Sequence, residues 1–106
     1  MSIQDLLVEQ GVLNDAIYQL RNQIIKAEID EANAEYILWT ETDFKKLNLT
    51  NKEMRTSYIK NKMSQHIAKI NSLKNDLKMT QNELSLNKTK IKIILEMGID
   101  LNDSES

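Results

Sequence analysis

The residues most able to do chemistry in this sequence are one histidine and a set of lysines. His66 is the only histidine and cysteine is absent. A zinc site needs three or four converging ligands, and no carboxylate lies one helical turn away from His66. We therefore expect His66 to be a polar residue in the seam between two helices, and we predict neither a metal nor a cofactor.

Catalytic constellations are also missing. A nucleophilic serine of the triad type needs a glycine-rich elbow, and a phosphate-binding loop needs glycines directly before a helix. The chain has two glycines, Gly11 and Gly98, and no proline. We predict that the protein has no catalytic residues and is not an enzyme.

Lysines are concentrated in the second half of the chain. Residues 1–44 hold nine acids and two bases, whereas residues 45–98 hold four acids and twelve bases. If the chain binds nucleic acid, the lysines expected to contact the phosphates are Lys88, Lys90 and Lys92. Proteins that bind single strands also stack aromatic side chains on the bases, and aromatic residues are scarce here. Direct nucleic-acid binding is therefore less favoured than a basic helix lying beside an acidic one.

Helices must position these side chains, because apolar residues recur at the a and d positions of a heptad. In the first segment the two series begin at Ile3 and Leu6, and nine of their eleven positions are apolar. In the second segment they begin at Thr56 and Ile59, and eight of twelve positions are apolar. The pattern predicts helices over residues of about 3–39 and 51–97. The polar members of the second series are expected to fix the register: Thr56, His66, Thr80 and Asn87.

The connection between these helices is predicted at residues 40–50. Thr42 or Asp43 can cap a short helical turn, and Asn48 tolerates the left-handed conformation that a chain reversal needs. Two long helices joined by a short connection pack antiparallel. We predict an all-α fold, a long antiparallel two-helix coiled-coil hairpin that spans residues 1–99.

The start and the end of the second helix each carry a signal. Thr50 and Glu53 have the spacing of a capping box, and Leu49 and Met54 have that of a hydrophobic staple. Gly98 is expected to end the helix in a left-handed conformation.

Beyond Gly98, Ile99 would contact Ile94, and residues 100–106 are predicted to be a disordered acidic tail. No apolar run approaches the ~20 residues of a membrane span, and the first residues do not resemble a signal peptide. We expect a soluble, cytoplasmic protein with no membrane partner.

Apolar residues outside the heptad stripes predict a further partner. Ile25, Ile29 and Ile37 lie off the stripe of the first helix. The most apolar stretch is the end of the second helix, and helices that are apolar around their circumference are normally buried. The candidate partner-binding residues are Trp39, Ile91, Ile93, Leu95 and Met97. The favoured interpretation is a homodimer that forms a helical bundle, and the alternative is a docking site for another protein.

Residues 39–59, WTETDFKKLNLTNKEMRTSYI, carry a resemblance that covers about a fifth of the chain. They resemble small coiled-coil proteins encoded in the replication and recombination regions of phages of low-GC Gram-positive bacteria. Those proteins carry a similar aspartate-aromatic, leucine-turn, cap, arginine and tyrosine sequence between two helices.

The resemblance implies a phage-type protein that binds DNA-metabolism proteins of the phage or of its bacterial host. One implied role is inhibition of a host replication factor, such as the helicase loader. The alternative is a recombination mediator that binds single-stranded DNA. A structural coiled-coil spacer is a third possibility. We expect the protein to act in the host cytoplasm.

Overall fold

The structure is a computed structural model of the 106-residue chain, and it describes residues 2–98. It contains three helices, α1 (Ile3–Glu41), α2 (Lys52–Lys62) and α3 (Ser64–Met97), and no strand occurs within the described range. The predicted all-α fold is confirmed. The predicted contact of Ile99 and the predicted acidic tail lie outside the described residues.

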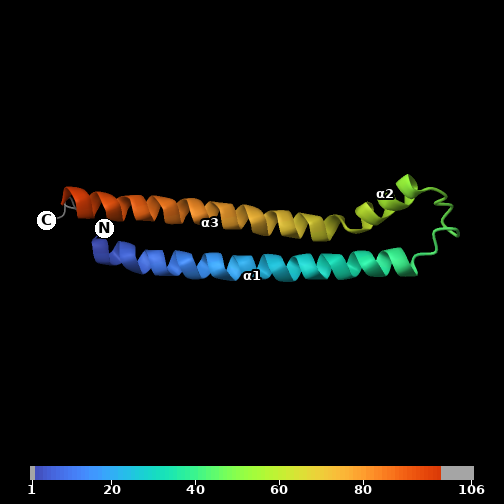
Figure 1. Cartoon of the computed structure of the whole chain (residues 1–106), viewed down its shortest axis with the longest axis horizontal. Helices are drawn as coiled ribbons and strands as arrows, with labels where there is room; N and C mark the ends of the chain where they lie inside the picture. Colours follow the sequence, from blue (N-terminus) through green and yellow to red (C-terminus); the bar gives the residue numbers. More distant parts are fainter. Residues whose placement is uncertain (1, 99–106) are drawn as a thin grey trace. The chain divides into compact units, whose positions relative to one another are not determined.

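The contacts within the chain divide it into two compact units. Unit 1 comprises Met1–Asn22 and Asn75–Ser106, and unit 2 comprises Gln23–Lys74. In each unit a segment of α1 lies beside a segment of the chain that runs in the opposite direction (Figure 1). The predicted antiparallel packing of the two helices is therefore found in each unit, and the connection between them lies in unit 2.

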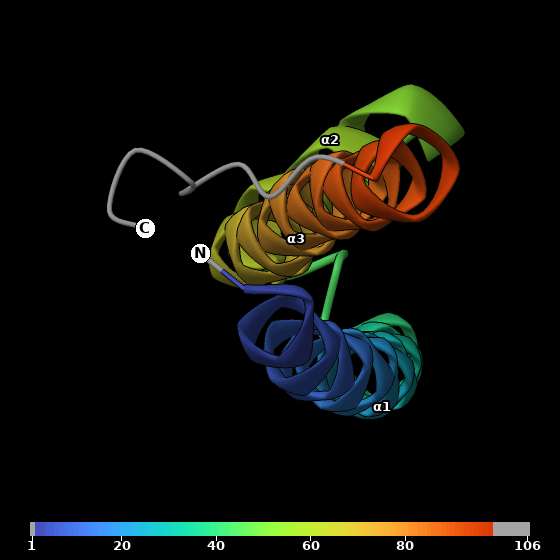
Figure 2. The same ribbon diagram turned by 90° about the vertical axis from the view of Figure 1, so that its left-hand side faces the viewer.

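The core of unit 1 is the predicted heptad seam. Leu6, Leu13 and Ile17 of α1 are buried against α3, which contributes Ile91. The first turns of α1 and the last turns of α3 lie side by side in two views (Figures 1 and 2). Every predicted a and d position of α1, in this unit and in unit 2, is buried or half-buried. The heptad therefore identifies the packing face of α1 correctly.

One polar side chain is enclosed in the seam of unit 1. Asn87 is 2% exposed, and its Nδ2 donates a hydrogen bond of 2.9 Å to the main-chain carbonyl of Leu6. Its Oδ1 is buried without a hydrogen-bond partner. Because an unpaired buried polar atom costs about 1–3 kcal/mol, a shift of α3 along α1 that broke this bond would be penalised. Asn87 is therefore enclosed in the seam, as its heptad position predicts, and its bond to Leu6 opposes a change of register in unit 1.

Helix α1 begins with a reciprocal cap that the sequence analysis did not identify. The Asp5 amide donates to Ser2 Oγ at 3.2 Å, and the Ser2 amide donates to Asp5 Oδ2 at 3.3 Å. This arrangement satisfies two amides at the start of α1, where no carbonyl of the helix is available. The serine and the acid three residues later were the signal for it.

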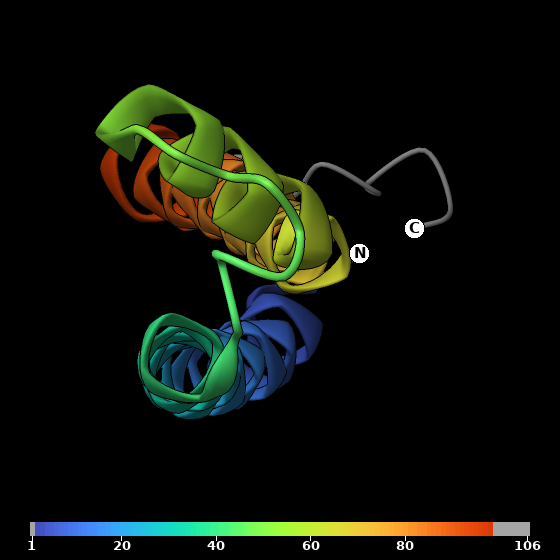
Figure 3. The same cartoon turned by 90° about the vertical axis from the view of Figure 1, so that its right-hand side faces the viewer.

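The core of unit 2 continues the heptad with smaller side chains on α1. Ile24 and Ala27 of α1 are buried against Ile59, Met63 and Ile70. His66 is half-buried beside this core, which agrees with its predicted place on the seam. Thr56 is exposed although it occupies a seam position, because α2 leans away from the end of α1 (Figure 3).

The connection between α1 and α2 contains one capped turn of helix. Asp43 Oδ1 accepts a hydrogen bond of 3.1 Å from the Lys46 amide. Asn48 has a φ of 59°, and the Leu49 amide donates to the Phe44 carbonyl at 2.9 Å, which closes the turn in the manner of a Schellman ending. The cap at Asp43 and the left-handed Asn48 are as predicted, and the same holds for Gly98, whose φ is 65°.

The predicted capping box at the start of the second helix is wrong. The N-cap is Asn51, whose Oδ1 accepts a hydrogen bond of 2.8 Å from the Met54 amide. Glu53 is then the second residue of the helix and not the third, where a capping box requires its carboxylate. Thr50 instead directs its hydroxyl toward Met54 Sδ, 3.9 Å away. Asparagine caps a helix as well as threonine does, and spacing alone could not separate the two.

An aromatic and cationic cluster holds the connection at the end of α1. The rings of Trp39 and Phe44 have centroids 5.5 Å apart, and the Arg55 guanidinium lies 5.1 Å from the centre of the Phe44 ring. Arg55 Nε also donates to the Leu49 carbonyl at 2.9 Å. The arginine therefore joins the end of α1, the connection and α2.

The single helix predicted over residues 51–97 is also wrong, because α2 and α3 are separated at Met63. This residue has a φ of −89° and a ψ of 0°, and its amide is shared between the carbonyls of Ile59 (2.9 Å) and Lys60 (3.2 Å). Such a tightened turn redirects a helix locally. Neither glycine nor proline occurs there, so no residue type marks the break in advance.

The opposite charges of the two halves form few close contacts. Among residues 2–98 the one ion pair within 4.0 Å joins Lys74 Nζ and Glu28 Oε2 at 3.8 Å, and both side chains are more than half exposed. A pair of this kind contributes only about 0–1 kcal/mol. The expected pairing of an acidic and a basic helix is therefore found at one position of the described chain.

Candidate protein-binding surfaces

The described residues offer surfaces, and no group of side chains arranged as a metal site occurs among them. None of the described helices is both long enough and apolar enough to cross a membrane. Comparison with protein-family models, with curated proteins and with solved structures finds no match to the chain. Evidence for function must therefore come from the exposed side chains themselves.

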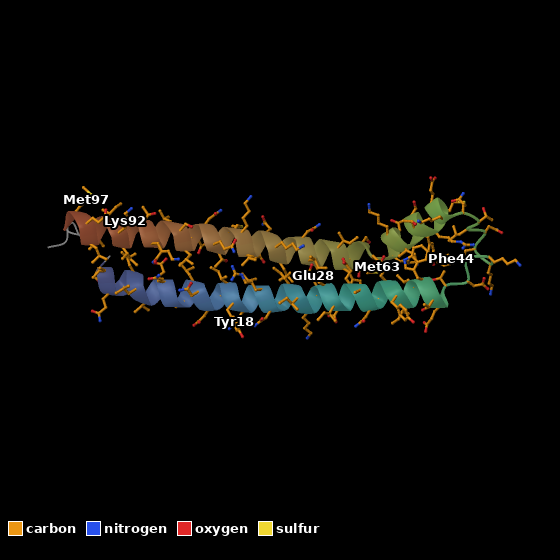
Figure 4. All side chains as sticks on the ribbon, in the orientation of Figure 1. Tyr18, Glu28, Phe44, Met63, Lys92 and Met97 are labelled. Carbon is orange, nitrogen blue, oxygen red and sulfur yellow. The ribbon has the colours of Figure 1, made fainter. Side chains whose placement is uncertain are left out.

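The apolar patch predicted at the end of α3 is divided between the core and the surface. Ile91 is buried in the core of unit 1, so it is not accessible to a partner, and Ile93 is half-buried. Leu95 and Met97 are 69% and 64% exposed. Met97 points away from α1 at the end of α3 (Figure 4). The patch that a partner could reach is therefore smaller than the sequence indicated.

A larger apolar surface lies on the solvent side of α1 in unit 2. Its members follow one another at intervals of four, three and four residues, and we call them the outer stripe: Ile25, Ile29, Ala32 and Tyr36. Each is exposed, Ile25 and Ile29 to 56% and Tyr36 to 70%. This is the spacing of a coiled-coil seam, but on a different face from the seam that packs on α2 and α3. Helix α1 thus carries a second helix-binding pattern whose partner face is free in this chain.

Trp39 lies three residues after Tyr36, so it continues the spacing of the outer stripe, and it also lines a groove. We call it the wedge groove, and it has a volume of about 270 Å³. Its lining residues are Glu31, Glu35, Trp39, Thr56, Ile59, Lys60, Met63 and Ile67. The groove lies where α2 leans away from the end of α1, and Met63, at the break between α2 and α3, is one of its lining residues. Trp39, predicted as a partner-binding residue, is 37% exposed at this place.

The predicted phosphate-binding lysines do not share one face. Lys88 and Lys92 are one helical turn apart and are exposed, whereas Lys90 is two residues from each and half-buried. Residues two apart on a helix point in different directions. Lys78 lies on the same side of α3 as Lys88 and Lys92, and none of these lysines is in an ion pair with a described carboxylate. A small basic face therefore exists on α3, without Lys90.

Half of the outer stripe is predictable from the sequence. Ile25 and Ile29 are apolar and lie off the predicted seam, whereas the prediction does not include Ala32 and Tyr36. The signal in the sequence is the spacing of four, three and four residues, which repeats on a different face of α1 from the main seam. Alanine and tyrosine are common on helix surfaces, and their part in the stripe is evident only from the spacing.

Proposed function

We propose that this chain is a non-enzymatic protein-binding module that receives a helix of its partner on the outer stripe. The observation that carries the proposal is the outer stripe itself. Its four members are exposed, follow coiled-coil spacing and include no charged residue. Isolated exposed apolar residues are ordinary on protein surfaces, but aligned ones mark interaction sites. A helix laid in a groove or along a stripe is a common way of recognising a partner.

The energy available from the outer stripe suits a reversible complex. Completing the burial of a half-exposed isoleucine contributes on the order of 1 kcal/mol, and a large aromatic contributes more. The loss of translational and rotational freedom on binding offsets several kcal/mol of that gain. Docking on the outer stripe alone is therefore expected to be moderate in affinity, and neighbouring contacts at Trp39 would add to it.

For the partner, we propose a protein of bacterial DNA replication, for example a helicase loader that a phage-encoded chain would inhibit. The support is the resemblance of residues 39–59 to small phage coiled-coil proteins. This segment starts at Trp39, at the end of the outer stripe, and it also supplies Thr56 and Ile59 of the wedge groove. The resemblance and the exposed apolar surface thus concern neighbouring parts of unit 2.

Calorimetric titration of the chain into a purified helicase loader from a low-GC Gram-positive bacterium tests the proposal. Ile29→Asp places a carboxylate in the centre of the outer stripe and should weaken binding at least tenfold, because that charge would be buried unpaired. Leu86→Asp is the matched control, since Leu86 and Ile29 are both 56% exposed and on helices. Equal binding by both variants would remove the outer stripe from the interaction.

Single-stranded DNA is the second candidate, and the unpaired basic face of α3 supports it. If Lys88 and Lys92 contact phosphates, Lys88→Gln with Lys92→Gln should weaken DNA binding and reduce its salt dependence, because fewer counterions are released. Lys90→Gln is the control, because Lys90 points elsewhere. A salt dependence that all three substitutions leave unchanged argues against DNA binding through this face.

A further inference from the structure

The two edges of the outer stripe differ in charge. Glu28 and Glu35 directly precede Ile29 and Tyr36 and form one edge, which we call the acidic edge. The opposite edge carries Asn33 and Thr40, and its one charge is Lys26 at the start. In coiled coils the residues at these edges select the partner and its direction, while the apolar stripe supplies the attraction.

We propose that the outer stripe takes an amphipathic helix whose basic residues lie along the edge that faces Glu28 and Glu35. This inference rests on the proposed function, since it assumes that the outer stripe is a docking site. Glu28 makes only the long, exposed contact with Lys74, and Glu35 has no cation within 4.0 Å among the described residues. Both carboxylates therefore remain able to pair with a partner.

The wedge groove gives the acidic edge a second means of holding a basic side chain. Glu35 lines this groove together with Glu31, and Trp39 provides an apolar wall beside them. Lys60 lines the same groove but is not within 4.0 Å of either carboxylate, so both glutamates can accept a second cation. Lysine and arginine bury an apolar stem while their charged head stays hydrated or paired. A basic residue of the docked helix near Tyr36 would place its stem against Trp39 and its head between the two glutamates.

A second copy of the chain is a poorer occupant of the outer stripe. Two outer stripes packed antiparallel would bring each acidic edge against its equivalent, which places like charges together. Packed parallel, the acidic edge would face Asn33 and Thr40, which offer no positive charge. Like charges across helices are destabilising, so charge complementarity favours a different chain with a basic edge.

Synthetic helical peptides of three heptads test this inference on the full chain. Both peptides carry leucine and isoleucine at positions a and d; one has lysine at both e and g, and the other has glutamine at both. The apolar faces are identical, so either direction of docking places an edge of known charge against Glu28 and Glu35. The lysine peptide should bind at least tenfold more tightly than the glutamine peptide by calorimetry.

The inference requires that the difference in affinity between the two peptides depends on the carboxylates of the acidic edge. Glu28→Gln with Glu35→Gln should reduce the preference to less than threefold, and high salt should reduce it as well. Glu83→Gln with Glu96→Gln removes two carboxylates of α3 and should leave the preference unchanged. Equal binding of both peptides by the wild-type chain, or a preference that survives loss of the acidic edge, overturns the inference.

The remaining outcomes separate this inference from the proposed function. Sedimentation equilibrium that shows self-association abolished by Ile29→Asp overturns the inference, because a second copy then occupies the stripe. The helicase loader could bind in a way that depends on Ile29 while neither peptide binds. In that case the proposed preference for a basic edge is wrong, and the outer stripe remains a docking site. If the loader and the peptides bind without regard to Ile29, both proposals fail.

Discussion

Unit 1 and unit 2 are built on the same heptad seam, but a residue inside the seam of unit 1 and residues outside the seam of unit 2 have different consequences. Unit 1 places a polar residue, Asn87, inside the seam, where it is 2% exposed. Unit 2 places apolar residues, those of the outer stripe, outside the seam. A polar residue inside a seam lowers stability and defines the register, whereas apolar residues outside it leave the seam intact and create a surface for a partner.

The largest expected effect tests whether the seam carries the stability of unit 1. Leu6 is completely buried and its neighbour Leu7 is 51% exposed. Leu6→Ala should lower the free energy of unfolding by about 2–5 kcal/mol, because it removes buried methyl groups and leaves a cavity. Leu7→Ala should change it by less than about 1 kcal/mol. Urea denaturation followed by far-UV circular dichroism measures both, and equal losses would show that the two faces are not distinct.

The second-largest expected effect concerns Asn87, and here the free energy of unfolding should increase. Asn87→Leu removes the unpaired Oδ1 along with one hydrogen bond, so the free energy of unfolding should rise by about 1 kcal/mol. The register should become less well defined, and the amide signals of unit 1 in a nitrogen–proton correlation spectrum should multiply or broaden. A variant that loses stability and keeps one sharp set of signals would show that Asn87 contributes stability rather than register.

The start of α2 provides a test of the same size in unit 2. Asn51→Ala should cost about 1 kcal/mol, since the Met54 amide loses its acceptor. Thr50→Ala is the control and should have little effect, because the threonine hydroxyl contacts only Met54 Sδ. Amide hydrogen exchange in α2 measures the local change. A larger effect at Thr50 than at Asn51 would restore the cap that the sequence analysis predicted.

The smallest effect concerns the ion pair of unit 2. Glu28→Gln should change the free energy of unfolding by less than about 0.5 kcal/mol, because both partners are largely hydrated. Thermal unfolding at low and high salt, for the wild type and the variant, checks this. A loss above about 1 kcal/mol that salt abolishes would assign Glu28 a structural role and weaken its place in the acidic edge.

The main seam was predictable because one physical requirement determines it. Two helices that pack along their length need an apolar residue every third or fourth position, and the heptad from Ile3 to Leu38 records that requirement directly. The left-handed Asn48 and Gly98 were predictable for a similar reason, since few residues tolerate positive φ. Each of these features depends either on the residue type at one position or on the regular spacing of apolar residues.

The features that escaped prediction depend on choices between near-equal alternatives. Thr50 and Asn51 are both good N-caps, and the fold uses the second. Met63 has an ordinary helix propensity, so its residue type does not indicate the break there. The extent of the outer stripe was missed because Ala32 and Tyr36 are not conspicuous singly. Charge segregation predicted more ion pairs than the one observed, since long side chains on exposed flanks remain in water.

Trp39 has a consequence for how the molecule can be observed. It is the single tryptophan, and its ring packs against that of Phe44 at a tilted angle within unit 2. Its intrinsic emission therefore monitors unit 2 alone, whereas helical ellipticity sums over both units. Unfolding curves from the two signals will coincide if the units melt as one cooperative body and will separate if each melts alone. An unmodified sample thus contains a built-in reporter for the independence of its two halves.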